Sequence, residues 1–197
     1  MTETRRSKRL ANTEPDVVAA PAKKARKAAP AKKADPKKGS SSPKVPSLKV
    51  GDTIVDVELK NEKDEPVSVL ELTKEMGAVF FMFPKANTPG CTKQACGFRD
   101  HHDAFKAAGY NVFALAQDNP TPLTTWQKGQ KLPYTLLSDK AHALIQQFGS
   151  SKDGKKKVQR SHVVVAKGGV IADMQPQVSP QESVDKALAF CKASASA

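Results

Sequence analysis

Residues 78–100 read AVFFMFPKANTPGCTKQACGFRD. The first six of these residues are continuously apolar, which is typical of a central strand covered on both faces. A turn rich in proline and glycine follows, and Cys91 stands where a helix is predicted to begin. The segment therefore predicts a strand, a turn and a helix in succession, with a cysteine at the start of the helix.

Similar patterns extend in both directions from this segment. Apolar or alternating runs predict strands at 53–59, 111–116 and 162–166, the last followed by a hairpin turn at 167–169 and by Val170-Ile171. Helical patterns predict helices over Thr92–Ala108, Pro122–Lys128, Ala141–Phe148 and Pro180–Lys192. Strands that alternate with helices and end in a hairpin predict an α/β protein with a thioredoxin-like fold, a mixed central sheet flanked by helices on both faces.

Residues 1–46 differ from the rest of the chain in composition. They contain six prolines and no aromatic residue, and they hold 13 of the 32 Lys and Arg but only 4 of the 20 Asp and Glu. The segment therefore carries a net charge of +9, against +3 for residues 47–197. Because such a composition cannot bury a core, we expect a disordered basic tail at 1–46 and one folded domain at 47–197.

The tail carries two short basic clusters. Their residues are Arg5, Arg6, Lys8 and Arg9 in the first, and Lys23, Lys24, Arg26 and Lys27 in the second. Nuclear import receptors read clusters of this kind, so we expect such a receptor as a partner and the nucleus as the location; the alternative is a soluble flexible spacer. The charge also predicts non-specific contact with DNA that salt weakens, whereas the lack of aromatic residues argues against sequence-specific binding.

The remaining composition limits where the protein acts. No stretch approaches the roughly 20 apolar residues of a membrane span, and the amino terminus lacks the apolar run of a secretory signal. We therefore expect a soluble intracellular protein without membrane contact. In such a protein, three cysteines indicate reactive or incidental thiols rather than a disulfide framework.

Cys91 is the candidate nucleophile, with a buried structural cysteine as the alternative. Unpaired backbone N–H groups and the macrodipole at a helix start favour the thiolate, which is the reactive form of cysteine. Thr88 lies in the same turn and can place its hydroxyl beside the sulfur or a bound substrate, or it can serve as a helix N-cap. Pro84 and Pro89 stiffen the turn, which is therefore predicted to hold one small substrate.

Cys96 follows Cys91 by five residues, and helix geometry gives that spacing a consequence. On a continuous helix the two Cα atoms lie about 8–9 Å apart. Disulfides usually need a Cα separation below about 7 Å. The two cysteines can therefore form a disulfide only after local unwinding of the helix, unless Cys96 is an unreactive residue on the helix face.

These residues resemble the active site of a known family. The spacing of Pro84, Thr88 and Cys91 is similar to the peroxiredoxin pattern, and the continuation at 92–100 resembles the peroxiredoxin Q or bacterioferritin-comigratory-protein subfamily. The segment 132–139, LPYTLLSD, is similar to a further motif of that family, and the resemblance covers about 47–192. The basic tail resembles the extension of fungal nuclear thiol peroxidases.

The resemblance implies a thiol peroxidase that reduces hydrogen peroxide and organic hydroperoxides. It assigns Cys91 as the peroxidatic residue and Cys96 as the resolving residue of an intramolecular disulfide, with thioredoxin as reductant and no cofactor. It also implies an active-site arginine, which is Arg160 here; an ion-pair role at the surface is the alternative. With Pro84, Thr88 and Cys91, Arg160 would bind the peroxide, and the subfamily implies a monomer.

Other residues are predicted to stay outside the chemistry. Cys191 follows Val184 and Leu188 on one apolar helix face, which predicts core packing. His101 and His102 are neighbours without a third ligand, so we expect no metal site. His142 and His162 receive no role, although His162 stands where the family commonly has an aromatic residue.

Two rival functions remain open at this stage. A general dithiol oxidoreductase typically has a Cys-x-x-Cys pair, whereas Cys91 and Cys96 are five residues apart. A chromatin- or nucleic-acid-associated binding protein, with the fold as a scaffold, would account for the basic tail but not for the turn before Cys91.

Overall fold

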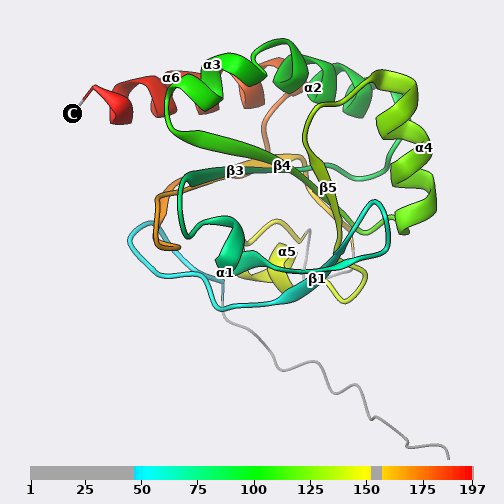
Figure 1. The fold of residues 1–197 in the computed structure, drawn as a ribbon, viewed down its shortest axis with the longest axis horizontal. Helices are drawn as coiled ribbons and strands as arrows, with labels where there is room; N and C mark the ends of the chain where they lie inside the picture. Colours follow the sequence, from blue (N-terminus) through cyan, green and yellow to red (C-terminus); the bar gives the residue numbers. More distant parts are fainter. Residues whose placement is uncertain (1–46, 152–156, 197) are drawn as a thin grey trace, which may run out of the picture. The chain divides into compact units, whose positions relative to one another are not determined.

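The computed structural model of the chain describes residues 47–151 and 157–196 (Figure 1). The predicted tail at 1–46 and its basic clusters lie outside the described residues, so the domain boundary stays a prediction. Within the described ranges, no helix is long and apolar enough to cross a membrane.

Seven strands form one mixed sheet in the described part of the chain, in the order β2-β1-β5-β4-β3-β6-β7. They are β1 (Glu58–Asn61), β2 (Pro66–Ser68), β3 (Gly77–Met82), β4 (Tyr110–Ala116), β5 (Thr135–Ser138), β6 (Ser161–Val165) and β7 (Ile171–Gln175). β4 runs parallel to β3 and β5, and the other pairings are antiparallel. The predicted mixed sheet and its terminal β6–β7 hairpin are confirmed.

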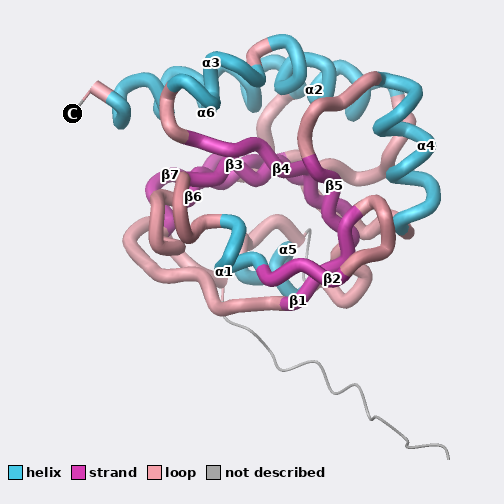
Figure 2. The backbone as a smooth tube through the Cα atoms, in the orientation of Figure 1, coloured by secondary structure: helices cyan, strands magenta, loops and turns pink. Residues whose placement is uncertain are grey.

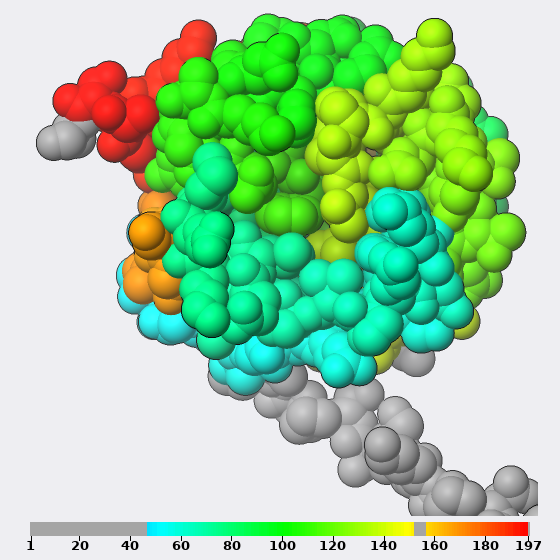
Figure 3. Space-filling model, in the orientation of Figure 1, coloured from blue at the N-terminus to red at the C-terminus, as the bar shows by residue number. Residues whose placement is uncertain are grey.

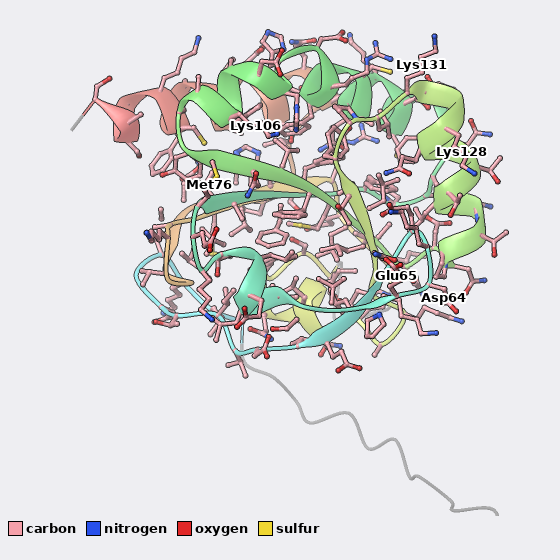
Figure 4. The ribbon with its side chains drawn as sticks, in the orientation of Figure 1. Asp64, Glu65, Met76, Lys106, Lys128 and Lys131 are labelled. Atoms are coloured by element: carbon pink, nitrogen blue, oxygen red, sulfur yellow. The ribbon has the colours of Figure 1, made fainter. Side chains whose placement is uncertain are left out.

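Helices cover both faces of this sheet (Figure 2). They are α1 (Val69–Leu72), α2 (Pro89–Asp100), α3 (His102–Ala107), α4 (Pro120–Gln130), α5 (Ala143–Gln147) and α6 (Pro180–Ala195). α2, α3, α4 and α6 lie on one side, and α1 and α5 lie on the other (Figure 2). Side chains fill the space between the sheet and both helical layers (Figure 4).

β3 is central because its two faces contribute to two separate cores. All six of its residues are buried. Val79 and Phe81 belong to the core beneath α2 and α6, whereas Phe80 and Met82 belong to the core on the side of α5. A strand that buries both faces has no polar alternation, which explains the continuously apolar sequence of the segment.

The largest differences from the predicted elements lie at 53–59 and 92–108. The strand predicted at 53–59 is confirmed only at Glu58, Leu59 and Thr53, the last of which forms an isolated antiparallel bridge with Val170. Residues 54–57 belong to no strand, and Val55 N–H donates to the Gln147 side chain instead of joining a ladder. The helix predicted at 92–108 begins earlier, at Pro89, and divides at His101, whose φ of −109° and ψ of 10° are not helical.

Three short elements were not predicted: β2, α1 and β5. The turn between β1 and β2 packs against α4, where the Thr124 hydroxyl donates to the Glu62 carbonyl. Figure 3 shows this contact from outside, with the turn in cyan against the yellow-green of α4. Elements of three or four residues are too short for periodicity to identify, so their position depends on such tertiary contacts.

The packing of α2 on α6 yields a prediction about two helical glycines. A Cβ at Gly97 in α2 would lie 2.8 Å from Val184 Cγ2 in α6, whereas a Cβ at Gly129 in α4 would meet no described atom within 4 Å. We expect Gly97→Ala to lower the free energy of unfolding by about 1–2 kcal/mol through overpacking. Gly129→Ala should raise it by about 0.5–1 kcal/mol, because alanine favours a helix over glycine.

Denaturant titration of the two single variants measures both changes. The variants carry the same chemical change on two helices, so each serves as the control for the other. A Gly97→Ala protein as stable as Gly129→Ala would contradict the described α2–α6 contact.

Candidate active site

The turn that follows β3 is held in a fixed shape. Ala86 N–H donates to Asp118 Oδ2 at 2.9 Å, which ties the turn to the segment after β4. Asn87 has a φ of 57°, in the left-handed region that asparagine tolerates better than most residues. Pro84, which the sequence placed in the substrate site, is exposed at the start of the turn.

Cys91 is the third residue of α2. Thr88 is the N-cap and Pro89 the first helical residue. Proline suits this position because an N–H group there would have no acceptor within the helix. In this first turn, the N–H groups of Gly90 and Cys91 have no acceptor within the helix and point toward its amino end. The predicted position of Cys91 at a helix start is confirmed, and its side chain is only 1% exposed.

Arg160 directly precedes β6, and its side chain reaches the sulfur of Cys91. Its Nη2 donates to Cys91 Sγ at 3.2 Å. Gly90 leaves the space for this approach, because a Cβ at that position would lie 3.1 and 3.2 Å from the two terminal guanidinium nitrogens. Among the described residues, Arg160 Nε is buried without a hydrogen-bond partner. The site therefore places the Cys91 sulfur beside the Arg160 guanidinium, which has one further N–H donor unused.

The Thr88 hydroxyl does not bond to the Cys91 sulfur. It donates to the Lys85 carbonyl at 3.1 Å, within the turn, and it makes no capping bond to the helix. The oxygen of a hydroxyl that donates its proton in this way still accepts hydrogen bonds. Thr88 thus combines the turn role with a free acceptor at the mouth of the helix.

Cys96 lies one and a half turns further along α2 and is half-buried. Its Sγ donates to Gln130 Oε1 at 3.6 Å, at the end of α4. Arg99 Nη1 donates to the carbonyl of the same Gln130 at 2.8 Å. Figure 4 shows Lys128 and Lys131 at this end of α4.

All three cysteines are free thiols in this structure, and α2 is continuous between Cys91 and Cys96. The helix geometry that keeps the two sulfurs from joining therefore applies.

Two aromatic residues also fasten α2, and the sequence reasoning missed both. Tyr134 donates its hydroxyl to the Ala95 carbonyl at 2.7 Å, and burial raises the pKa of this phenol well above its usual value. Trp126 Nε1 donates to Thr92 Oγ1 at 3.3 Å, next to Cys91. Trp126 lies in α4, and Tyr134 lies before β5 in the 132–139 motif, but neither position indicates a contact with α2, which only the tertiary fold reveals.

Cys191 lies in the core as expected. It is fully buried, and burial together with Asp173 raises the pKa of its thiol to about 12. His101 is exposed and His102 half-buried, with the pKa of His102 lowered by burial. Within the described residues, no group of His, Cys, Asp and Glu side chains could hold a metal ion.

His162, which received no role from the sequence, belongs to a buried polar chain. Its Nδ1 lies 3.3 Å from Ser183 Oγ in α6, and Gln94 Nε2 in α2 donates to the same Oγ at 2.9 Å. All three side chains are fully buried. Burial lowers the pKa of His162 to about 4, against the attraction of the Asp173 carboxylate, so the imidazole is neutral near pH 7. A histidine within an apolar strand sequence carries no signal of these partners.

Comparison with known proteins agrees with this fold and site. The family model described as AhpC/TSA family matches residues 50–174. Peroxiredoxin bcp1 of Schizosaccharomyces pombe is 40% identical over 144 residues, which cover 73% of this chain and 74% of that protein. The chloroplastic peroxiredoxin Q of Arabidopsis thaliana is 35% identical over 145 residues, covering 73% and 67%. The chain spans between 61% and 74% of the lengths of these and three further curated relatives.

A solved structure gives the same result. Peroxidoxin BcpB from Mycobacterium tuberculosis has 31% sequence identity and a TM-score of 0.69, over 74% of this chain and 97% of its own. A buried cysteine that starts a helix beside an arginine, on this fold and with these relatives, defines a thiol peroxidase. The chain belongs to the AhpC/TSA family, among the peroxiredoxin Q and Bcp proteins. The expected family and the thioredoxin-like α/β fold are confirmed.

Proposed function

We propose that the protein reduces hydrogen peroxide and organic hydroperoxides through Cys91 and Cys96 and is recycled by thioredoxin. The observation that supports this best is the 3.2 Å contact between Arg160 Nη2 and Cys91 Sγ at the start of α2. A guanidinium and the positive end of a helix both favour an anionic sulfur, and the thiolate is the form that attacks a peroxide.

In the first step the Cys91 thiolate attacks one oxygen of the peroxide. A sulfur–oxygen bond forms and the O–O bond breaks, with its electron pair leaving on the second oxygen. That oxygen takes a proton and departs as water or an alcohol. The sulfur is oxidised by two electrons to a sulfenic acid, and the peroxide is reduced by the same two.

The surroundings of Cys91 supply groups for this transition state. Charge develops on the leaving oxygen, and the unused Arg160 Nε donor is a candidate to bind it. The Thr88 hydroxyl donates a hydrogen bond to the Lys85 carbonyl, and its oxygen can accept a hydrogen bond from the peroxide O–H. The exposed Pro84 bounds the turn that brings these groups together. We assign peroxide binding to Pro84, Thr88, Cys91 and Arg160.

In the second step Cys96 resolves the sulfenic acid. Its thiolate attacks the Cys91 sulfur, the sulfur–sulfur bond forms, and the sulfur–oxygen bond breaks with loss of water after protonation. Because α2 holds the two residues apart, its turns from Cys91 to Cys96 must unwind first. Unwinding breaks the bonds of Cys96 to Gln130 and of Ala95 to Tyr134.

An external dithiol then restores both thiols by two successive exchange reactions. Thioredoxin is the reductant that the family resemblance favours. These steps use only protein thiols, so the proposal needs no cofactor.

Cysteine variants test this function. We expect Cys91→Ser to consume no peroxide above the uncatalysed rate, because serine is not nucleophilic in this setting. Cys96→Ser should form a sulfenic acid in a single turnover but should not turn over with thioredoxin and thioredoxin reductase. Cys191→Ala, which alters a buried thiol outside the site, should keep the wild-type rate. The measurements are peroxide consumption and intact mass after thiol alkylation.

Peroxide consumption by Cys91→Ser at the wild-type rate would show that the nucleophile is misassigned. Sustained turnover of Cys96→Ser would leave Cys91 as the nucleophile but remove the intramolecular disulfide from the cycle.

We further propose that the protein acts in the nucleus. The basic clusters of residues 1–46 supply the charge that an import receptor reads, and the same charge favours non-specific contact with DNA. A binding protein that uses the fold only as a scaffold is the alternative, but it leaves the Arg160–Cys91 contact without a purpose. We propose a monomer on the basis of the subfamily resemblance.

Deletion of residues 1–46 tests both roles of the tail. A fluorescent fusion of residues 47–197 should lose the nuclear enrichment of the full chain, and its affinity for DNA at low salt should fall because most of the net charge is gone. A matched full-length fusion with the lysines and arginines of the tail changed to glutamine separates charge from length. Unchanged nuclear enrichment of both fusions would contradict an import role for the tail.

A further inference from the structure

The buried chain of Gln94, Ser183 and His162 connects the helix that must unwind to parts of the fold that do not. Gln94 belongs to α2 and lies between Cys91 and Cys96 in the sequence. Ser183 belongs to α6 and His162 to β6, the strand next to β3. This network of side chains therefore links α2 to α6 and to β6.

Ser183 Oγ contacts both other side chains of this network. Gln94 Nε2 donates to Ser183 Oγ, and the Ser183 hydroxyl can donate to His162 Nδ1 when that nitrogen carries no proton. Nδ1 accepts in the neutral tautomer that has its proton on Nε2, and Nε2 lies 3.8 Å from Asp173 Oδ2 in β7, without a hydrogen-bond partner among the described residues. The other charged group that acts on His162 is Lys186 of α6. Ser183 thus links Gln94 of α2 to His162 of β6.

Gln94 is held on one side only. Its Nε2 is bonded, but among the described residues its Oε1 is buried without a hydrogen-bond partner. A buried acceptor without a partner favours release to water, while the bond to Ser183 opposes release. A side chain with these opposed tendencies is suited to a segment that must leave its place during the cycle.

We propose that Gln94, Ser183 and His162 form a latch that keeps α2 helical and thereby sets the rate at which the Cys91 sulfenic acid becomes a disulfide. The proposal rests on the proposed function, in which α2 unwinds after the first step. Gln94 and Ser183 are positioning residues here, because neither contacts the sulfur or the peroxide. The latch sets the time during which a second peroxide can oxidise the sulfenic acid to a sulfinic acid.

The test is a two-phase kinetic measurement on the full chain. Trp126 is the single tryptophan, and its indole bonds to Thr92 at the start of α2, so its fluorescence reports on that turn. The first phase should depend on peroxide concentration and the second should not. We expect Ser183→Ala to leave the first phase unchanged and to speed the second about five-fold, which corresponds to the loss of one buried hydrogen bond.

A double-mutant cycle separates the latch from general stability. In a Gln94→Leu background, Ser183→Ala should leave the second phase unchanged, because Ser183 no longer holds anything on α2. Intact mass after excess peroxide should show about five-fold less sulfinic acid in Ser183→Ala alone. Ser194→Ala, the same change at an exposed site on α6, should match the wild type in every measurement.

Two results would overturn the latch: a second phase that Ser183→Ala leaves unchanged, or one that it speeds equally in both backgrounds. Cys96→Ser distinguishes this failure from failure of the proposed function. If the second phase persists in Cys96→Ser, the disulfide step itself is wrong. If it disappears in Cys96→Ser but does not respond to Ser183→Ala, only the latch is wrong.

Discussion

The site depends on the contact between the Arg160 guanidinium and the Cys91 sulfur at the first turn of α2. The Cys91 sulfur is 1% exposed and has almost no water around it, so the protein must supply the charge and donors that stabilise a reacting sulfur. The helix start provides N–H groups, and Arg160 provides a guanidinium. Gly90 admits the guanidinium, and the bond from Ala86 to Asp118 fixes the turn on the other side.

The same helix creates a conflict within the cycle. In the proposed cycle, α2 is intact when Cys91 meets a peroxide and unwinds to bring Cys96 to the oxidised sulfur. The surroundings of α2 are consistent with both needs: Tyr134 and Trp126 fasten its turns by single hydrogen bonds, and the Gln94 side chain is bonded on one side only. Helix α2 is thus held by a few hydrogen bonds in addition to the apolar packing of Ala95 and Phe98.

The sequence predicts this site better than it predicts the details of the fold. β3 and the start of α2 follow from a long apolar run and from the proline and glycine of the turn, which are local signals. Residues 53–59 alternate like a strand, but Thr53 forms only an isolated bridge with Val170, and the Val55 N–H group donates to the Gln147 side chain, so tertiary contacts override the local alternation. The role of Arg160 followed only from the family motif, because 69 residues separate it from Cys91. Local sequence does not indicate the contacts that Tyr134 and Trp126 make with α2, or the contact of His162 with Ser183, because each contact joins segments far apart in the chain.

The rate of Cys91 oxidation in an Arg160→Lys variant tests the central claim most directly. Lysine keeps the positive charge but loses the planar array of donors that can contact the sulfur and a peroxide oxygen together. Stopped-flow measurement of the second-order rate constant with hydrogen peroxide should show a decrease of about 100-fold, with the free energy of unfolding close to that of the wild type. A rate constant that stays near the wild-type value would contradict the account, because the sulfur would then react without the guanidinium.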